Sequence, residues 1–225
     1  MTATTDQTDA KRQNTVIAVD AMGGDSGPSA IVAGCAAFAK RRKDVDIILH
    51  GPQATLEDLV LRRKQLNGRV TIRDAAEVVS MEDKPSHVVR NGKKTSMWAT
   101  IETVRSGDAS VAVSCGNTGA LMAVSMIRLR KLPGVNRPAI AVLWPSSNPQ
   151  GFNVMLDVGA DIRADADDLM RYALMGASYA RNGMELPRPR IGLLNVGTEE
   201  HKGRPELHEA YELIAAQAEQ ANFEF

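Results

Sequence analysis

Short apolar runs alternate with longer amphipathic stretches along most of this chain. The apolar runs predict strands at Thr15–Asp20, Asp46–His50, Arg69–Arg73, Ala109–Cys115, Ala139–Leu143, Phe152–Asp157 and Arg190–Asn195. The amphipathic stretches predict helices at 28–43, from Pro52 to about Asn67, at a short segment ending near Asn91, at 95–106, from Gly119 to Lys131, at 165–182 and at 205–221. Continuous apolar strands that alternate with helices are typical of a buried parallel sheet. The pattern therefore predicts an α/β protein, a three-layer αβα sandwich with a mostly parallel sheet.

The two ends of the chain differ from this pattern. Residues 1–14 are polar and lack the apolar stretch of a signal peptide, so we expect a disordered leader before a single domain over 15–225. The last four residues, Asn222–Phe225, look like the start of another strand. We therefore expect the domain to be truncated at its C-terminus.

Composition and charge exclude several classes of function. The chain has 27 basic and 27 acidic residues and few aromatic ones, which argues against a nucleic-acid-binding protein. No apolar run reaches the length of a membrane-spanning helix. Its two cysteines fit no metal-ligand or CxxC spacing and indicate a reducing compartment. We expect a cytoplasmic protein that needs neither a metal nor a cofactor.

Four glycine-rich loops follow predicted strands. In open parallel sheets, ligands bind beyond the carboxyl ends of the strands. Glycine lets the backbone approach a ligand closely, small polar side chains add donors, and a following helix N-terminus attracts anions. The four loops therefore predict an anion site, with phosphate favoured, and they lie at 20–25, 116–120, 157–161 and 195–200.

The loop Gly116–Ala120 by itself has two interpretations of about equal weight. Thr118 either caps the following helix by accepting a backbone hydrogen bond, or it belongs to the anion site. Four such loops in succession make a purely structural role for all of them less favoured. None of the four matches a Walker A or GxGxxG motif, which argues against nucleoside triphosphates and dinucleotides.

One lysine and four histidines lie near the predicted loops or on helices. Lys202 follows a strand-end loop and is placed to neutralise a bound phosphate, although a single loop lysine is more often solvated. We favour a surface position for the neighbouring His201 over a general-acid role. The other histidines are expected to be structural or solvent-exposed: His50, His87 and His208.

The cysteines and the basic clusters have structural interpretations that we favour. Cys115 ends a strand beside a glycine loop, where a nucleophile is feasible, but no histidine is near it in sequence and a small buried thiol is favoured. Cys35 is expected in the core. The basic clusters are expected to complement helix dipoles, with the steering of an acidic protein as the alternative, and they lie at 40–43, 62–64 and 128–131.

Taken together, the four loops resemble those of a known enzyme family. The motifs are Ala18–Asp25 with Pro28, Ser114–Ala120, Asp157–Ala160, and Leu193–Glu200 with Lys202-Gly203. In this order they resemble the PlsX family of phosphate acyltransferases of bacterial phospholipid synthesis, from about Val16 to the end of the chain. Position 115 departs from the family, which usually has a smaller residue such as Ala there. That departure argues further against a cysteine nucleophile.

The resemblance implies a Rossmann-like fold of the isocitrate/isopropylmalate dehydrogenase-like type. The implied reaction transfers a fatty acyl group from acyl carrier protein to inorganic phosphate and gives acyl-phosphate. The implied partners are acyl carrier protein, a second copy of the chain in a homodimer, and the downstream membrane acyltransferase PlsY. The implied location is the cytoplasm, with peripheral association at the inner face of the membrane.

The resemblance also suggests a role for each loop. Gly116, Asn117, Thr118 and Gly119 would hold phosphate or the developing oxyanion, and Lys202 would neutralise phosphate charge. The remaining residues would line or shape the site: Asn195, Gly197 and Thr198, and Asp20, Gly23, Gly24 and Asp157. Three alternatives stay open, namely a phosphotransacetylase-like enzyme using short acyl-CoA, a dehydrogenase, and a non-catalytic phosphate- or acyl-ligand-binding protein.

Overall fold

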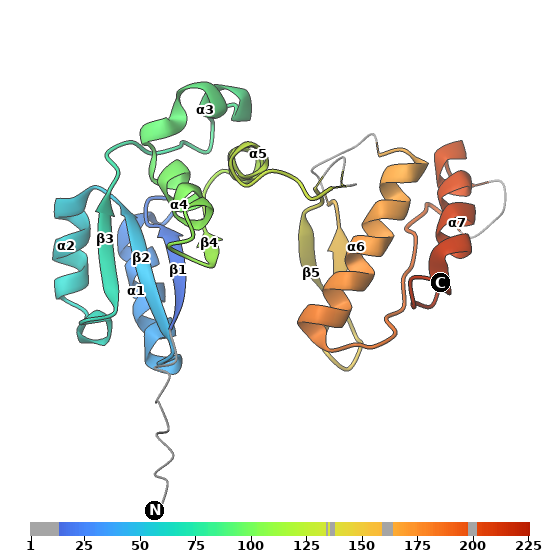
Figure 1. The fold of residues 1–225 in the computed structure, drawn as a ribbon, viewed down its shortest axis with the longest axis horizontal. Helices are drawn as coiled ribbons and strands as arrows, with labels where there is room; N and C mark the ends of the chain where they lie inside the picture. The colour runs from blue at the N-terminus through green and yellow to red at the C-terminus, as the bar shows by residue number, and fades with distance from the viewer. Residues whose placement is uncertain (1–13, 134, 136–137, 159–163, 198–201) are drawn as a thin grey trace, which may run out of the picture. The chain divides into compact units, whose positions relative to one another are not determined.

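We analysed a computed structural model of the chain, which describes residues 14–133, 135, 138–158, 164–197 and 202–225. Its contacts divide into two compact units, Met1–Arg130 and Lys131–Phe225. Each unit is described below by itself (Figure 1). Apart from Asn14, the predicted leader lies outside the described residues, and the single domain expected over 15–225 stays a prediction.

The first unit contains a four-stranded parallel sheet in the order β3-β2-β1-β4. Its strands are β1 (Thr15–Asp20), β2 (Val45–Gly51), β3 (Val70–Asp74) and β4 (Val111–Val113). Val19 of β1 is in register with Leu49 on one side and with Val113 on the other. Because all strands run in the same direction, the segments that follow Asp20 and Val113 leave the sheet at the same edge.

Helices cover both faces of this sheet. On one face, α1 (Gly27–Arg41) and α2 (Gln53–Leu61) pack on alternate strand residues, and the core there includes Val32, Leu49 and Leu56. On the other face, α4 (Ser96–Arg105) contacts β1, β2 and β4. This arrangement confirms the predicted three-layer sandwich with its mostly parallel sheet.

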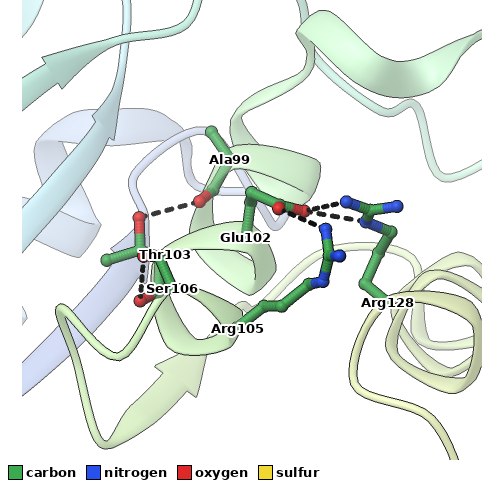
Figure 2. Close-up of polar contacts among 6 residues, drawn as sticks. All are labelled: Ala99, Glu102, Thr103, Arg105, Ser106 and Arg128. Atoms are coloured by element: carbon green, nitrogen blue, oxygen red, sulfur yellow. Dashed lines mark hydrogen bonds and ion pairs between the residues drawn. The ribbon is translucent and has the colours of Figure 1, made fainter.

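A second apolar cluster joins α4 to α3 (Pro85–Asn91) and α5 (Thr118–Arg128). Glu102 of α4 binds Arg105 at 2.8 Å and Arg128 of α5 at 2.7 Å, as Figure 2 shows. The Arg128 guanidinium also lies 5.4 Å from the ring centre of Trp98. The C-terminal end of α5 is therefore fixed to α4 by an ion pair and a cation–π contact.

The helix predicted after β2 is shorter than expected. Instead of running to Asn67, α2 ends at Leu61, and a short 3₁₀ helix, η1 (Lys64–Leu66), follows. Leu66 is buried against the core that α1 forms with the sheet. The chain must turn to bury this side chain, and a continuous α-helix from Gln53 would not make that turn.

The described residues of the second unit form two strands and two helices. β5 (Ala141–Pro145) and β6 (Phe152–Leu156) form a hairpin, and α6 (Ala166–Met184) contacts both β6 and α7 (Pro205–Ala218). Asp165 caps α6, because its Oδ1 accepts the N–H of Asp168 at 2.8 Å. The core of this unit includes Ala177, Ile214 and Phe223.

The pairing of β5 with β6 is antiparallel, which differs from the parallel pairs of the first unit. The linking segment 146–151 explains the difference. A parallel connection needs a crossover of roughly a dozen residues or more, whereas a short turn suffices between antiparallel strands. Gly151 has φ 80°, and its carbonyl accepts a hydrogen bond from the N–H of Ser146. These two features close the turn.

The strand predicted at Arg190–Asn195 is wrong over most of its length. Arg190 forms a single parallel bridge with Glu224, and the N–H of Ile191 donates to the Glu224 carbonyl at 2.8 Å. Beyond this point Leu194 and Val196 are exposed. The expected start of a strand at the last four residues is therefore present as this one bridge.

His50 is a buried titratable group of the first unit, at the C-terminal end of β2. Its ring is 2% exposed, and its Nε2 lies 2.9 Å from the Thr103 Oγ1 on α4. Burial, together with the positive charge of Arg73, lowers the pKa of His50 from 6.5 to about 4. His50 was expected to be structural or solvent-exposed, and its burial and its contact with Thr103 agree with the first alternative.

The lowered pKa of His50 predicts a pH dependence of stability. Between pH 6.5 and about 4 the unfolded chain binds a proton that the folded chain does not, so the free energy of unfolding falls as the pH is lowered. The loss is roughly 3 kcal/mol over this window. His50→Gln should remove it, so denaturant unfolding at pH 7 and pH 4.5 should differ less in the variant than in the unchanged chain.

The matched control is His87→Gln on α3, where the side chain is exposed. This variant should keep the full pH dependence. Equal pH dependence in the His50→Gln variant and in the unchanged chain would contradict the effect assigned to His50.

Candidate functional site

The ends of β1 and β4 are joined through the carboxylate of Asp20. This side chain is 2% exposed, and its Oδ2 accepts a hydrogen bond from the Ser114 hydroxyl at 2.7 Å. Its Oδ1 accepts the N–H of Met22 at 3.2 Å, and the Ser114 Oγ accepts the N–H of Gly116 at 3.1 Å. The first two predicted glycine loops are therefore connected by one buried carboxylate and one hydroxyl.

The glycines of the first loop lie directly against the second loop. A Cβ on Gly23 would lie 2.7 Å from the backbone nitrogen of Gly116 and 2.9 Å from the Asp20 Oδ2. Gly24 has φ +94°, and a Cβ there would approach the Cβ and carbonyl oxygen of Cys115 to 3.1 Å. The distances at Gly23 are shorter than side-chain atoms adopt, so this position requires glycine. At Gly24 a side chain would be tightly packed and strained by the positive φ, so glycine is favoured there as well.

Asn117, and not Thr118, caps helix α5. Its Oδ1 accepts the N–H of Ala120 at 3.0 Å, while Thr118 is the first helical residue and is exposed. Of the two interpretations of Thr118, the helix cap is therefore wrong, and membership of the anion site stays a prediction. The N-cap residue precedes the first turn, and from there the Asn117 side chain accepts a hydrogen bond from one of the free N–H groups of that turn. Thr118 lies within the turn and is less well placed to do so.

The amide nitrogen of Asn117 binds a segment that the sequence did not single out. Its Nδ2 donates to the carbonyls of Ser80, Met81 and Asp83 at 3.2, 3.1 and 2.9 Å. Within this segment, the Asp83 Oδ2 accepts the N–H of Ser80 at 2.8 Å. Asn117 is 8% exposed, so one buried side chain joins the turn 80–83 to the start of α5.

The turn 80–83 lies close to the N-terminus of α5. A Cβ on Gly119 would lie 3.0 Å from the Cγ of Pro85, the first residue of α3. Among the residues that the structure describes, the N–H groups of Thr118 and Gly119 have no hydrogen-bond acceptor. They carry the partial positive charge of a helix N-terminus and can bind an anion.

The two cysteines have different surroundings. Cys35 on α1 is buried as predicted, and burial, with a smaller effect of Cys115, raises the pKa of its thiol to about 11. Cys115 is exposed, so the expectation of a buried thiol at this position is wrong. Its backbone lies against Gly24, and this contact, together with the turn that follows β4, leaves the side chain at the surface.

In the second unit, the backbone at Asp157 has an unusual conformation. Asp157 directly follows β6, is half-buried and has φ 63°. Aspartate is among the few side chains that tolerate this region of backbone angles. The three residues after Val158 in the predicted loop, Gly159–Asp161, lie outside the described residues.

Two of the predicted residues in the last loop lie together. The Asn195 Nδ2 donates to the carbonyl of Lys202 at 3.1 Å, and its Oδ1 accepts the N–H of Val196 at 2.8 Å. Gly203 has φ +97°, and a Cβ there would lie 2.5 Å from the Asn195 Oδ1. Asn195 therefore fixes the backbone that carries the half-buried Lys202.

The remaining predicted residues of this unit lie partly outside the described residues. Gly197 is half-buried beside Asn195, whereas Thr198 and His201 lie outside the described residues. His208 on α7 is exposed, as expected. No helix in the described part of the chain is long and apolar enough to cross a membrane.

Comparison with known proteins gives a family and a set of close relatives. Residues 15–224 match the model of the family described as "Fatty acid synthesis protein". The phosphate acyltransferase of Roseobacter denitrificans is 70% identical over the whole chain, and that of a Ruegeria species is 69% identical. The chain spans 63% and 60% of the length of these two relatives, or about three fifths.

Two solved structures share the fold. A phosphotransacetylase from Streptococcus pyogenes matches with a TM-score of 0.66 and 19% identity, and the EutD phosphotransacetylase of Staphylococcus aureus with a TM-score of 0.61 and 14% identity. Each match covers 94% of this chain and 67% of the solved chain. At these identities the likeness shows the fold alone, and it supports the predicted α/β class.

Two glycine substitutions should change the free energy of unfolding in opposite directions, because Gly23 lies at the close approach of the first two loops and Gly34 does not. Gly23→Ala places a methyl group against Asp20, Ser114 and Gly116, and should lower the free energy of unfolding by about 1–3 kcal/mol. Gly34→Ala, at an exposed position on α1 with open space around it, should raise it by about 0.5–1 kcal/mol. Urea denaturation measures both changes, and destabilisation of the same size in both variants would contradict the packing described.

The bridge made by Asn117 predicts that one substitution frees the turn 80–83 without unfolding α5. Asn117→Asp keeps an acceptor for the helix cap but replaces the donor with a charge that faces three carbonyls. Hydrogen exchange at the amides of Ser80 and Asp83 should become at least tenfold faster, while exchange within α5 changes little.

Asn67→Asp is the control for the added charge, because Asn67 is exposed. It should leave exchange in the turn unchanged. Slow exchange at residues 80–83 in the Asn117→Asp variant would show that this side chain does not hold the turn.

Proposed function

Because the chain belongs to the fatty acid synthesis protein family, matched over residues 15–224, we propose that it transfers a fatty acyl group from acyl carrier protein to inorganic phosphate. The product is an acyl-phosphate for phospholipid synthesis. The names of the close relatives support acyl transfer to phosphate, and they agree with the resemblance found in the four sequence motifs. The observation that carries the proposal is the pair of strand-end loops joined by Asp20 beside the unpaired start of α5.

The chemistry of this reaction suits a site made of backbone amides. Phosphate monoesters lose their second proton near pH 6, and a substantial fraction of inorganic phosphate is also a dianion at neutral pH. The leaving group is a thiolate, whose thiol has a pKa of about 8.5. Phosphate can therefore attack the thioester carbon directly: a bond forms between a phosphate oxygen and the thioester carbon, the C–S bond breaks, and the thiolate leaves. The protein has to position the reactants and stabilise the developing charge.

We assign anion binding to the first turn of α5. The N–H groups of Thr118 and Gly119 are the donors, and Gly116 permits the close approach of the preceding loop. Asn117 had been expected to touch phosphate, but its amide is buried and bonded to three carbonyls. We therefore assign Asn117 a positioning role, in which it holds the helix start and the turn 80–83 together.

The other predicted residues keep the roles that the sequence suggested. Asp20, Gly23 and Gly24 shape the first loop, and Asp157 shapes the loop after β6. Asn195, Gly197 and Thr198 of the last loop are assigned to line the site, and Asn195 fixes the backbone of this loop at Lys202. The ammonium group of Lys202 is assigned to neutralise phosphate charge.

The partners and the location are those that the resemblance to the family implies, and they belong to the proposal. They are acyl carrier protein and phosphate as substrates, a homodimer, and the membrane acyltransferase PlsY as the consumer of the product. A cytoplasmic enzyme at the inner face of the membrane suits a product with a long acyl chain and an anionic head.

One alternative function comes from the two solved structures described above, because both are phosphotransacetylases. An enzyme of that type would use short acyl-CoA. Incubating the chain with phosphate and either palmitoyl-acyl carrier protein or acetyl-CoA, then trapping acyl-phosphate with hydroxylamine, separates the two functions. The proposal expects product from the carrier-protein thioester, with the Roseobacter denitrificans relative as the positive control.

Product from acetyl-CoA alone would support the alternative. Binding of phosphate without turnover of either thioester, under conditions in which the relative is active, would support a non-catalytic protein and contradict the proposed function.

Lys202→Ala should lower the rate of acyl-phosphate formation by roughly 100-fold or more, because a charge that stabilises phosphate is lost. The circular dichroism spectrum should not change, since Lys202 is in a loop. Lys94→Ala, at an exposed lysine of the 3₁₀ helix η2 (Gly92–Lys94), is the control and should keep full activity. An active Lys202→Ala variant would remove this residue from the mechanism.

A further inference from the structure

One lysine of the first unit lies between two contacts with the start of α5. The carbonyl of Asp83, the residue before Lys84, accepts a hydrogen bond from the Asn117 Nδ2 at 2.9 Å. The Cγ of Pro85, the residue after it, lies 3.0 Å from the position that a Cβ on Gly119 would take. Asn117 is the N-cap of α5 and Gly119 is its second residue, so the backbone of Lys84 is held beside the first turn of this helix.

The backbone of Lys84 is also fixed by α3. Its carbonyl accepts the N–H groups of His87 at 2.8 Å and Val88 at 3.2 Å, which form the first turn of that helix. Val88 is buried in the apolar cluster that also contains Ala120 and Val124 of α5. The two helices are therefore packed together, and Lys84 keeps its place where both of them begin.

The side chain of Lys84 has no counter-charge among the described residues. It is exposed and makes no hydrogen bond or ion pair with any of them. The two acidic residues that precede it, Glu82 and Asp83, do not pair with it, and a carboxylate oxygen of Asp83 accepts the N–H of Ser80 instead. An ammonium group on a flexible four-carbon stem is thus available at the start of α5.

Helix dipoles make this position an unfavourable one for a cation. Lys84 is the N-cap of α3, where serine, threonine, aspartate and asparagine are preferred, and it also lies beside the N-terminus of α5. Both helix ends carry partial positive charge, which attracts anions and repels cations. A lysine at this point stabilises neither helix, whereas an anion bound where the two helices begin would account for its charge.

We propose that Lys84 binds the phosphate that the proposed reaction consumes, together with the N–H groups of Thr118 and Gly119. The inference rests on the proposed function, which places phosphate at the first turn of α5. Lysine binds phosphate as a point charge, and its three N–H donors can adjust to an anion that backbone amides hold. Lys84 also offsets the charges of Glu82 and Asp83, which would otherwise repel phosphate from this helix end.

This assignment gives the first unit a cation of its own for phosphate. Lys202, to which a similar role was assigned above, belongs to the second unit. The two assignments are independent, because Lys84 is placed by contacts within the first unit alone. Phosphate binding at α5 should therefore require Lys84 whether or not Lys202 takes part.

Phosphate binding without turnover tests the proposal directly. Isothermal titration calorimetry with inorganic phosphate, in the absence of any acyl thioester, gives the dissociation constant. Lys84→Gln should raise this constant roughly tenfold or more, because a charge-assisted contact is lost. Lys84→Arg keeps the charge and should bind within about threefold of the unchanged chain. In the acyl-transfer assay, Lys84→Gln should raise KM for phosphate by a similar factor and leave KM for palmitoyl-acyl carrier protein unchanged.

Lys94→Gln is the matched control, because it makes the same change of net charge at an exposed lysine of η2. It should leave the dissociation constant for phosphate unchanged. The free energy of unfolding should be the same in Lys84→Gln and in the unchanged chain, since the Lys84 side chain has no partner among the described residues. Equal loss of phosphate binding in the Lys84→Gln and Lys94→Gln variants would indicate a general effect of charge and overturn the proposal.

The calorimetry and the acyl-transfer assay separate this inference from the proposed function. Phosphate binding that depends on Lys84, without acyl-phosphate from either thioester, would support the inference and contradict the proposed function. Acyl-phosphate formation with the same KM for phosphate in the Lys84→Gln variant would do the reverse. A chain that binds no phosphate at millimolar concentrations would also overturn the inference.

Discussion

The buried carboxylate of Asp20 is the interaction on which the arrangement of the first unit's loops depends. It accepts one hydrogen bond from its own loop and one from Ser114, and the Ser114 oxygen accepts another from Gly116. A carboxylate without these donors would be costly to bury. The ends of β1 and β4 therefore keep their close approach, and two glycines leave the space that the approach requires.

This arrangement positions backbone donors, and in the proposed reaction it leaves the attack on the thioester to phosphate. Helix α5 is fixed at its start by Asn117 and at its end by Arg128, so the free N–H groups of its first turn hold a constant direction. Donors that are oriented before the substrate binds need little reorganisation during the reaction, which is the main source of electrostatic stabilisation in enzymes. The exposed thiol of Cys115 lies beside the same loop. It would be the nucleophile in the alternative chemistry, in which the acyl group is first transferred to the protein.

Local patterns in the sequence were sufficient to predict most of the fold. The apolar runs predicted both ends of β1 correctly and both ends of β2 to within one residue. The residue at which α6 was predicted to start, Asp165, is its N-cap. The features that were missed depend on contacts between distant residues. The partners of Asn117 lie more than thirty residues away, Cys115 was expected to be buried, and the run at 190–195 pairs with the described chain at a single bridge. The antiparallel hairpin was predictable from the short segment 146–151, but the alternating pattern favoured a parallel sheet.

Direct transfer of the acyl group to phosphate is the central claim, and intact-mass spectrometry of the chain during turnover tests it most directly. The chain would be mixed with palmitoyl-acyl carrier protein and phosphate, quenched in acid within milliseconds to seconds, and weighed. Our account predicts that acyl-phosphate accumulates while the mass of the chain stays unchanged, and that Cys115→Ala reacts at the same rate. A palmitoyl adduct on Cys115, or on any other side chain, that forms and decays as fast as product appears would contradict it.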